Sequence, residues 1–312
     1  MDGRTKLKRR PWTWGDGALV VMASLGVIWL GIFAYLPMAG ITMAFKEGNK
    51  ATNLFLEMFQ SKWTLGNFSM LFKDSVFWQV FWNTVCINLL FLLCGFPMPI
   101  IFALLLNEIR KRAFKTTVQT ICNFPHFLSW VVFGGIILML TDPLTGIVNP
   151  ILEFFRLSSS ENPVNLNLAK YFYPKIILAS LIKSTGWGSI IYMAAIAGID
   201  PSLYEAAVID GANRFQRAAR ITLPSIRPTI IILLLLNISG LLGNSFEQFY
   251  VFQTTENLSR TRVLATYMYT LSFTYRNYST ATALSLAEGL VGLALLLSAN
   301  FIAKKTTGDG IF

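Results

Sequence analysis

The sequence predicts an all-α membrane protein with six transmembrane helices. Of its 312 residues, 54% are hydrophobic and 13% are charged, which is typical of a membrane protein rather than a soluble one. Six apolar stretches approach the ~20 residues that a helix needs to cross a bilayer. Short segments rich in Lys and Arg lie between them, as expected on a cytosolic surface. The predicted spans cover about residues 18–36, 77–106, 124–140, 176–199, 229–249 and 281–302.

A basic tail, residues 1–16, precedes the first span and is expected to lie in the cytoplasm. A cleaved signal peptide would have a shorter apolar core followed by a small-residue cleavage site. The first span is therefore expected to remain as an uncleaved helix. Pro37 and Gly40 should loosen this helix before Lys46, because proline interrupts the helical hydrogen-bond ladder.

The next elements alternate between the two sides of the membrane. Residues 46–75 form an external loop, and Pro97 and Pro99 predict a kink in the long second span. The basic residues of 107–115 place that turn in the cytosol. Residues 142–175 and 250–280 are the other external segments, whereas 200–228 and the tail 304–312 lie inside. Six crossings therefore leave both termini in the cytoplasm.

Several classes of protein are excluded by what the sequence lacks. The net charge of +10 comes from basic residues beside apolar spans. The sequence lacks the stripe of interleaved cationic and aromatic residues that is typical of a nucleic-acid-binding surface. No phosphate-binding GxxxxGK[ST] loop is present, and the single His126 has no ligand cluster around it. The three cysteines lie in or next to apolar stretches and are expected to pack there. The sequence predicts a chain without catalytic residues, metal or cofactor.

The polar segment 200–228 predicts a helix-turn-helix at the membrane surface. Asp200 can cap a helix that begins at Pro201, and Gly211 fits the left-handed position that ends it. Asn213 can start a second short helix, which is expected to stop before Pro224. The small residues of the first helix offer a face that another protein's groove could approach closely.

Polar residues inside the predicted spans are candidates for a substrate pathway, since a charge at mid-bilayer costs about 2.5–3.5 kcal/mol unless it faces a cavity or a partner. They could instead hold neighbouring helices together, which we favour for any single asparagine. For Lys183, Glu288 and the face of Trp187, both interpretations stay open. The candidates for the pathway are Asn83, Lys183, Ser184, Trp187, Asn237, Asn244, Gln248 and Glu288.

A spaced motif crosses the 200–228 segment: Glu205-Ala206-Ala207, three residues, Gly211, nine residues, Ile221, one residue, then Leu223-Pro224. The motif resembles the EAA loop of membrane permeases in binding-protein-dependent ABC importers. The resemblance implies a coupling helix and turn that dock in the groove of an ATPase. The coupling residues it implies are Glu205, Ala206, Ala207, Asp210, Gly211, Leu223 and Pro224.

Two further segments, 35–41 (YLPMAGI) and 124–132 (FPHFLSWVV), resemble the LplB/YteP-like branch of sugar permeases. The likeness implies a type I importer permease domain over residues 17–303, in a bacterial cell membrane. It also implies a second homologous permease, two cytosolic ATPase subunits that bind ATP and Mg, and an extracytoplasmic solute-binding protein. An oligosaccharide would be the cargo, moved by alternating access.

Two other functional classes remain possible from the residues alone. A secondary transporter or channel would use Lys183 and Glu288 as coupling charges, and uptake would then depend on an ion gradient. A membrane scaffold would use the polar faces only to hold helices together, and its loss would leave uptake unchanged. Neither class explains the spacing of the EAA motif.

Overall fold

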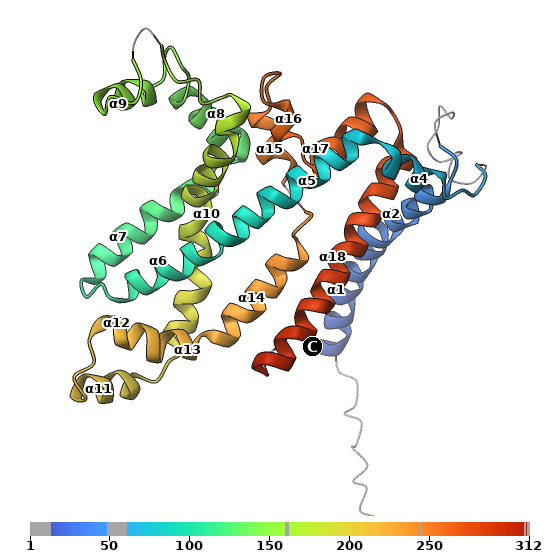
Figure 1. Cartoon of the computed structure of the whole chain (residues 1–312). Coiled ribbons are helices and arrows are strands. Elements are labelled where there is room, and N and C mark those ends of the chain that lie inside the picture. Colours follow the sequence, from blue (N-terminus) through green and yellow to red (C-terminus); the bar gives the residue numbers. More distant parts are fainter. Residues whose placement is uncertain (1–13, 49–60, 160–161, 244, 309, 311–312) are drawn as a thin grey trace, which may run out of the picture.

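A computed structural model describes residues 14–48, 61–159, 162–243, 245–308 and 310, and within these ranges the chain is helical with no β-sheet. In Figure 1 the longer helices diverge from the region where α5, α15 and α17 lie close together. Most of the predicted basic tail 1–16 and the pathway candidate Asn244 lie outside the described residues.

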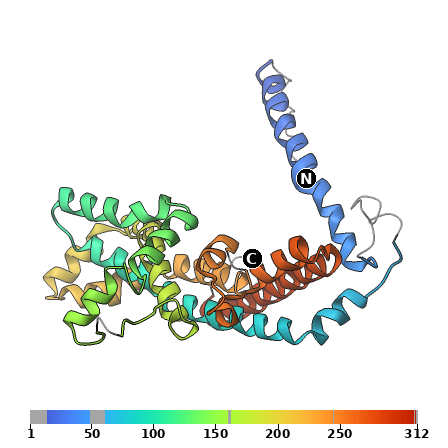
Figure 2. The same cartoon turned by 90° about the horizontal axis from the view of Figure 1, so that it is seen from above.

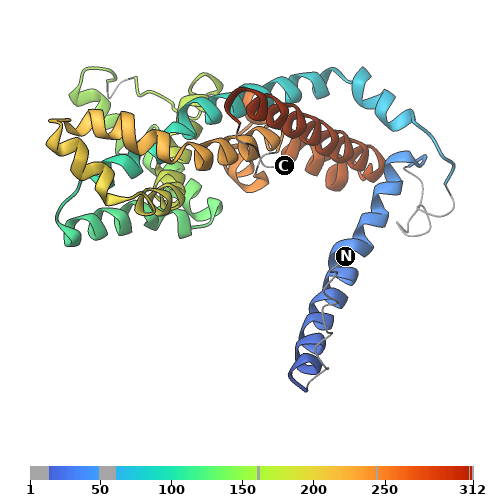
Figure 3. The same ribbon diagram turned by 90° about the horizontal axis from the view of Figure 1, so that it is seen from below.

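The N-terminal helix is long and changes its winding near its end. It comprises α1 (Trp14–Leu30), the π-helical η1 (Gly31–Tyr35), α2 (Leu36–Met38) and the 3-10 helix η2 (Ala39–Phe45). The tighter winding starts just after Pro37, where the sequence predicts a loosened helix. The last part, η2, packs against α18 and α4, whereas α1 projects away from the rest of the chain in Figures 2 and 3.

The second helical run follows the short helix α4 (Gly66–Lys73) and comprises α5 (Ser75–Leu90), the π-helical η3 (Phe91–Gly95) and α6 (Pro97–Asn107). The Asp74 carboxylate caps α5 by accepting the Val76 N–H at 2.9 Å. The π turn lies immediately before Pro97, which lacks the N–H that a regular α-helix would use. The predicted irregularity is therefore present as a change of winding.

The third predicted span, 124–140, differs most from the structure. Helix α7 (Arg112–Asn123) begins well before the apolar run, continues as the 3-10 turn η4 (Phe124–Phe127) and is followed by α8 (Trp130–Leu140) at a bend of 101°. The Ser129 hydroxyl starts α8 by accepting the Val132 N–H at 3.2 Å. The predicted cytosolic turn is accordingly shorter than 107–115, since α7 begins at Arg112.

The external segment 142–175 contains α9 (Val148–Phe154) and η5 (Ala169–Tyr171) and leads into the 26-residue α10 (Phe172–Ala197). The buried Asn149 organises it: its amide donates to the carbonyls of Pro143 and Val164, both at 3.1 Å, and accepts the Val164 N–H at 2.9 Å. Helix α10 packs against α6 and α7 and is the centre of one half of the molecule.

The remaining elements form the surface segment and the C-terminal half. They are α11 (Pro201–Ile209), α12 (Arg214–Arg217), η6 (Ala218–Thr222), α13 (Leu223–Ser225), α14 (Arg227–Ser239), α15 (Phe246–Phe252), α16 (Leu258–Thr261), α17 (Leu264–Tyr269), η7 (Thr270–Thr274) and α18 (Tyr278–Thr307). Instead of continuing through the predicted span 229–249, helix α14 stops at Ser239. Its 13 residues extend about 20 Å, less than the ~30 Å bilayer core.

Three apolar clusters hold these helices together. One joins η2, α4, α5, α17 and α18 around Val80 and Leu284, and a second joins α5, α8, α10 and α15 around Phe172 and Phe249. The third joins α6, α10 and the segment before α14 around Tyr192. By length and composition, four helices could cross a membrane, or up to six if each of two bent pairs forms one span.

Candidate functional site

The surface segment 200–228 folds as the predicted pair of short helices, at the lower left of Figure 1. The Asp200 carboxylate accepts the Ser202 N–H at 2.9 Å at the start of α11, and this bond lowers the pKa of the exposed carboxyl. Gly211 adopts φ +76° after α11, a conformation that costs a residue with a Cβ free energy. Asn213 and Gln216 then cap α12 reciprocally, with bonds of 2.9 and 2.8 Å.

The second helix continues further than predicted. After α12 the helix continues as the wider π turn η6 and then returns to α-helical winding in α13. Pro224 occupies one of the first positions of α13. The wider turn accommodates the missing proline N–H, so the helix ends at Ser225 rather than before Pro224. The Tyr204 hydroxyl meets the buried Thr222 hydroxyl at 2.9 Å and joins α11 to this second helix.

The predicted coupling residues lie on an uncovered surface. Glu205, Ala206, Asp210 and Gly211 are exposed, Pro224 is exposed, and Ala207 and Leu223 are half-buried. Large apolar side chains surround them: Ile209 is 86% and Phe215 87% exposed. An apolar surface of this kind beside polar residues is typical of a protein-binding site. We call residues 201–217 the docking surface.

The docking surface is tied to the turn between α6 and α7. The Glu108 carboxylate lies 3.8 Å from Nε of Arg214 and 3.9 Å from a terminal nitrogen of Arg217. Ion pairs of this length between side chains that water still reaches contribute at most about 1 kcal/mol. The two ion pairs therefore favour one orientation of α12 but contribute little to its stability. The sequence offers no signal that pairs Glu108 with these arginines, because the two segments are far apart along the chain.

We expect Tyr204→Phe to loosen α11 without unfolding the chain. The substitution removes the 2.9 Å bond to Thr222, which is worth about 1 kcal/mol. Amide hydrogen exchange in α11 should then be about fivefold faster, since 1 kcal/mol corresponds to that factor. Tyr35→Phe is the matched control, because Tyr35 is 69% exposed and far from α11. Equal rates of amide hydrogen exchange in α11 of both variants would contradict a stabilising role of the Tyr204–Thr222 hydrogen bond.

One cavity, of about 560 Å³, collects several predicted pathway residues. Ser184 and Trp187 reach it from α10, Asn237 from α14 and Gln248 from α15. Gln248 is only 7% exposed, and its Nε2 has no hydrogen-bond partner among the described residues. A buried amide without a partner is costly, so this donor is available to a ligand. We call this the smaller cavity.

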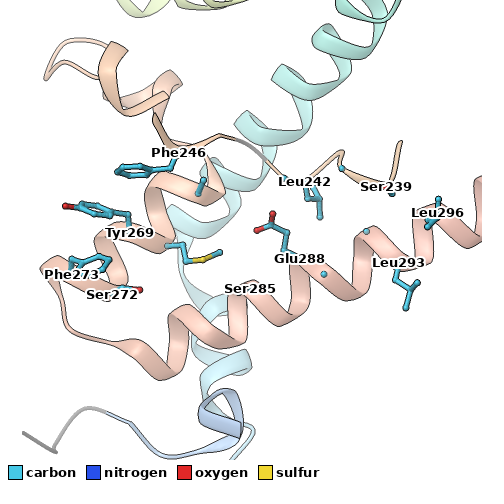
Figure 4. Close-up of a pocket in the computed structure, with 16 residues that line it drawn as sticks. Ser239, Leu242, Phe246, Tyr269, Ser272, Phe273, Ser285, Glu288, Leu293 and Leu296 are labelled. Carbon is cyan, nitrogen blue, oxygen red and sulfur yellow. The ribbon is translucent and has the colours of Figure 1, made fainter. Parts of the chain in front are cut away.

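A second cavity, of about 740 Å³, contains Glu288 and is shown in Figure 4. The Glu288 side chain extends from α18 toward the segment that carries Leu242 and Phe246. Phe246, Tyr269 and Phe273 line the opposite wall. We call this the larger cavity. Gly240 and Gly243 line both cavities, so the two meet where α14 breaks off before α15. Irregular backbone at membrane depth is tolerated where it lines such a cavity.

Other predicted pathway residues bond to backbone groups of the chain itself. The Lys183 ammonium donates to the carbonyls of Pro125, His126 and Leu128, at the turn between α7 and α8. It does not line either cavity. The Asn83 amide donates to the Ser259 and Arg262 carbonyls at 2.8 and 3.1 Å, which ties α5 to α16. These contacts are those expected of side chains that hold helices together.

The chain matches the family model of the binding-protein-dependent transport system inner membrane component over residues 95–306. It belongs to this family. Protein LplB of Bacillus subtilis is 38% identical over 98% of this chain and 92% of its own length. The polygalacturonan/rhamnogalacturonan transport system permease protein YteP of the same organism is 37% identical over 94% and 90%, respectively.

A solved structure of similar fold is that of a bacterial ABC transporter involved in the import of the acidic polysaccharide alginate. It superposes with a TM-score of 0.84 at 35% identity, over 94% of this chain and 97% of the other. Another structure holds that alginate transporter with a periplasmic protein bound to an alginate pentasaccharide, with the same TM-score. The predicted all-α permease fold is thereby confirmed. The chain is a permease, a membrane transport subunit rather than an enzyme, of an ABC importer that works with a binding protein.

Sequence reasoning missed the aromatic wall of the larger cavity in the permease. Phe246 and Tyr250, like Tyr269 and Phe273, are four residues apart, a spacing that places both rings of each pair on one helix face. That spacing is visible in the sequence. The meeting of the two pairs is not, because it depends on how α15 packs against α17.

Proposed function

We propose that the permease translocates an oligosaccharide into a bacterial cell by alternating access, paired with a second, homologous permease. Two cytosolic ATPase subunits would bind ATP and Mg, and one of them would receive the docking surface of this chain. The observation that carries this proposal is the exposed helix α11, which holds Glu205, Ala206 and Ala207 of the coupling motif among apolar side chains. It provides a rigid, uncovered helix for an ATPase groove.

Sugars are proposed as the cargo because the relative YteP is a permease for polygalacturonan/rhamnogalacturonan and the solved relative is involved in the import of alginate. The two cavities suit such a cargo. They combine aromatic and aliphatic walls with a few amides and hydroxyls, the division of surfaces expected for a polyhydroxylated ligand. Asn237 and Gln248 would bind hydroxyl groups beside the Trp187 ring.

The cycle would convert ATP binding into movement of the cavities. A loaded solute-binding protein docks on the external segments, ATP closes the two ATPases, and α11 follows the subunit in which it is seated. The two permeases then turn the cavity outward to receive the cargo, and hydrolysis returns it to the cytosol. Ligands can drive such a change only by binding one state more tightly than the other.

Co-purification tests the docking surface. The permease is expressed with its genomic neighbours as wild type, as Glu205→Lys and as Gly211→Asp. We expect the ATPase to accompany the wild type and to fall at least tenfold in both variants, because one reverses an exposed charge and the other strains the φ +76° turn. Glu47→Lys, an equally exposed glutamate of the predicted external loop, is the matched control.

Each outcome of the co-purification has a defined meaning. Loss of the ATPase in the two variants, but not in Glu47→Lys, supports coupling through α11. Retention of the ATPase in both variants would contradict the assignment of the docking surface. A second permease is expected to remain bound in all four proteins, since the substitutions lie away from the cavities.

A further inference from the structure

Three aromatic residues, Phe246, Tyr269 and Phe273, line the larger cavity, and a fourth, Tyr250, packs beside them. Phe246 and Tyr250 of α15 stack with ring centroids 4.8 Å apart, and Phe246 lies 4.6 Å from Tyr269 of α17. Tyr269 is 5.0 Å from Phe273 of η7 and 5.7 Å from Tyr250. Figure 4 shows Phe246, Tyr269 and Phe273 on the same side of the cavity. We call these four residues the aromatic track.

No other part of the described chain covers the aromatic track completely. Tyr250 is 51%, Tyr269 38% and Phe273 67% exposed. The C–H faces of a pyranose are apolar, whereas its hydroxyls lie around the ring edge. A row of exposed aromatic faces can therefore bind successive sugar rings while leaving their hydroxyls to polar groups across the cavity.

Glu288 is the polar group across the cavity. It is half-buried, and among the described residues its carboxylate has no hydrogen-bond donor or ion-pair partner. Its Oε1 lies close to Gly243, where an added Cβ would be 3.6 Å from it. An unpaired acid in an apolar surrounding is costly. Sugar hydroxyls, which are hydrogen-bond donors, would satisfy it.

The charges of the two cavities discriminate between classes of sugar. Neither lining contains Lys, Arg or His, and Glu288 is the one charged residue that lines them in the described part of the chain. A polyuronate would bring carboxylates next to Glu288 without a cation to offset them. A carboxylate that leaves water for an apolar cavity without a paired cation carries a large desolvation cost, and an ionised Glu288 would add like-charge repulsion. An uncharged glycan meets no such repulsion.

We propose that the larger cavity is a binding subsite for an uncharged oligosaccharide, whose pyranose rings stack on the aromatic track while Glu288 accepts their hydroxyls and rejects uronic acids. The proposal rests on the proposed transport of a sugar and names its chemical class. It separates this chain from the relatives described above as carrying polygalacturonan or alginate.

Direct binding tests the subsite in the purified complex of both permeases and the ATPases, with ATP and vanadate and without solute-binding protein. Omitting that protein removes its own selectivity from the result. The probes are fluorescently labelled neutral oligosaccharides (gluco-, galacto-, xylo- and arabino-oligomers) and labelled oligogalacturonates. We expect wild type to bind at least one neutral probe, and oligogalacturonates at least tenfold more weakly.

The variants separate stacking from charge. Tyr269→Leu and Phe273→Leu should each weaken neutral binding about tenfold, whereas Phe301→Leu, a control with the same 67% exposure as Phe273, should not. Glu288→Gln should weaken neutral binding several-fold, and Glu288→Lys should gain binding of oligogalacturonate. Glu247→Gln, an exposed glutamate of α15 that does not line either cavity, is the control for charge loss.

The proposal is overturned if wild type prefers oligogalacturonate, if it binds neither class of probe, or if the track variants behave like Phe301→Leu. It is also overturned if Glu288→Gln releases the second permease, because Glu288 would then belong to the interface. Failure of the proposed transport function looks different: the wild-type complex would lack an ATPase, or its hydrolysis would not respond to any loaded solute-binding protein.

Discussion

Replacing Gly186 by valine is expected to lower the stability of the permease by about 3 kcal/mol, at the upper end of the usual cost of overpacking. A Cβ at Gly186 would overlap the carbonyl oxygen of Cys122 and lie 2.7 Å from Oδ1 of Asn123. The first contact is with backbone, so no side-chain rotation can relieve it. Helix α10 would have to move away from α7, which it contacts along this face.

The measurement is the thermal unfolding temperature of the purified variant, followed by tryptophan fluorescence. Gly135→Val is the matched control, because an added Cβ there meets no atom within 4 Å. We expect the unfolding temperature of Gly186→Val to fall by several degrees below that of Gly135→Val. If the two variants unfold together, the close packing of α10 on α7 is not a determinant of stability.

Lys183→Met is the second substitution with a large expected effect. The Lys183 ammonium donates to the Pro125 carbonyl at 3.1 Å, to the His126 carbonyl at 2.9 Å and to the Leu128 carbonyl. These carbonyls belong to the turn where the chain bends by 101° between α7 and α8 and the α-helical hydrogen-bond ladder is interrupted. The Pro125 carbonyl also accepts the Leu128 N–H, at 3.3 Å. Each hydrogen bond to a charged donor is worth about 1.5–3 kcal/mol.

Methionine keeps the length of the side chain and removes all of these donors. We expect a loss of at least about 3 kcal/mol in stability, measured by thermal or denaturant unfolding in detergent. Lys183→Arg should retain part of the stability, because guanidinium can still donate, and Lys73→Met, an exposed residue at the end of α4, should change little. A Lys183→Met protein of native stability that fails to transport would instead favour the predicted pathway role.

The bend between α7 and α8 illustrates a feature that hydropathy misses. Residues 112–123 mix Arg, Lys, Thr and Gln with apolar residues, so their sequence resembles the end of a cytosolic turn. In the structure they form α7, because α10 packs along one side of this amphipathic segment, where Val118, Cys122 and Asn123 are half-buried. The apolar run that follows, residues 124–140, is divided by the turn that Lys183 holds.

The end of helix α14 is a second feature that hydropathy does not predict. Residues 229–249 are apolar enough to predict one continuous span, and the glycines at 240 and 243 are tolerated in membrane helices. The structure ends α14 at Ser239 and places the two glycines between two cavities. The pathway role of Asn237, Gln248 and Glu288 stays a prediction. The structure adds their positions: the first two line the smaller cavity and Glu288 the larger one.

The sequence by itself determined the helical membrane fold, the order of the helices and the EAA motif with its caps, because these follow from local composition and from residues a few positions apart. Only the tertiary structure decided which polar side chains bond to backbone carbonyls and which face a cavity. Lys183 and Glu288 have the same polar signal in the sequence. Their surroundings differ because α10 carries Lys183 to the turn after α7, whereas α18 carries Glu288 to the gap beyond α14. Contacts between residues far apart in the chain decide that difference.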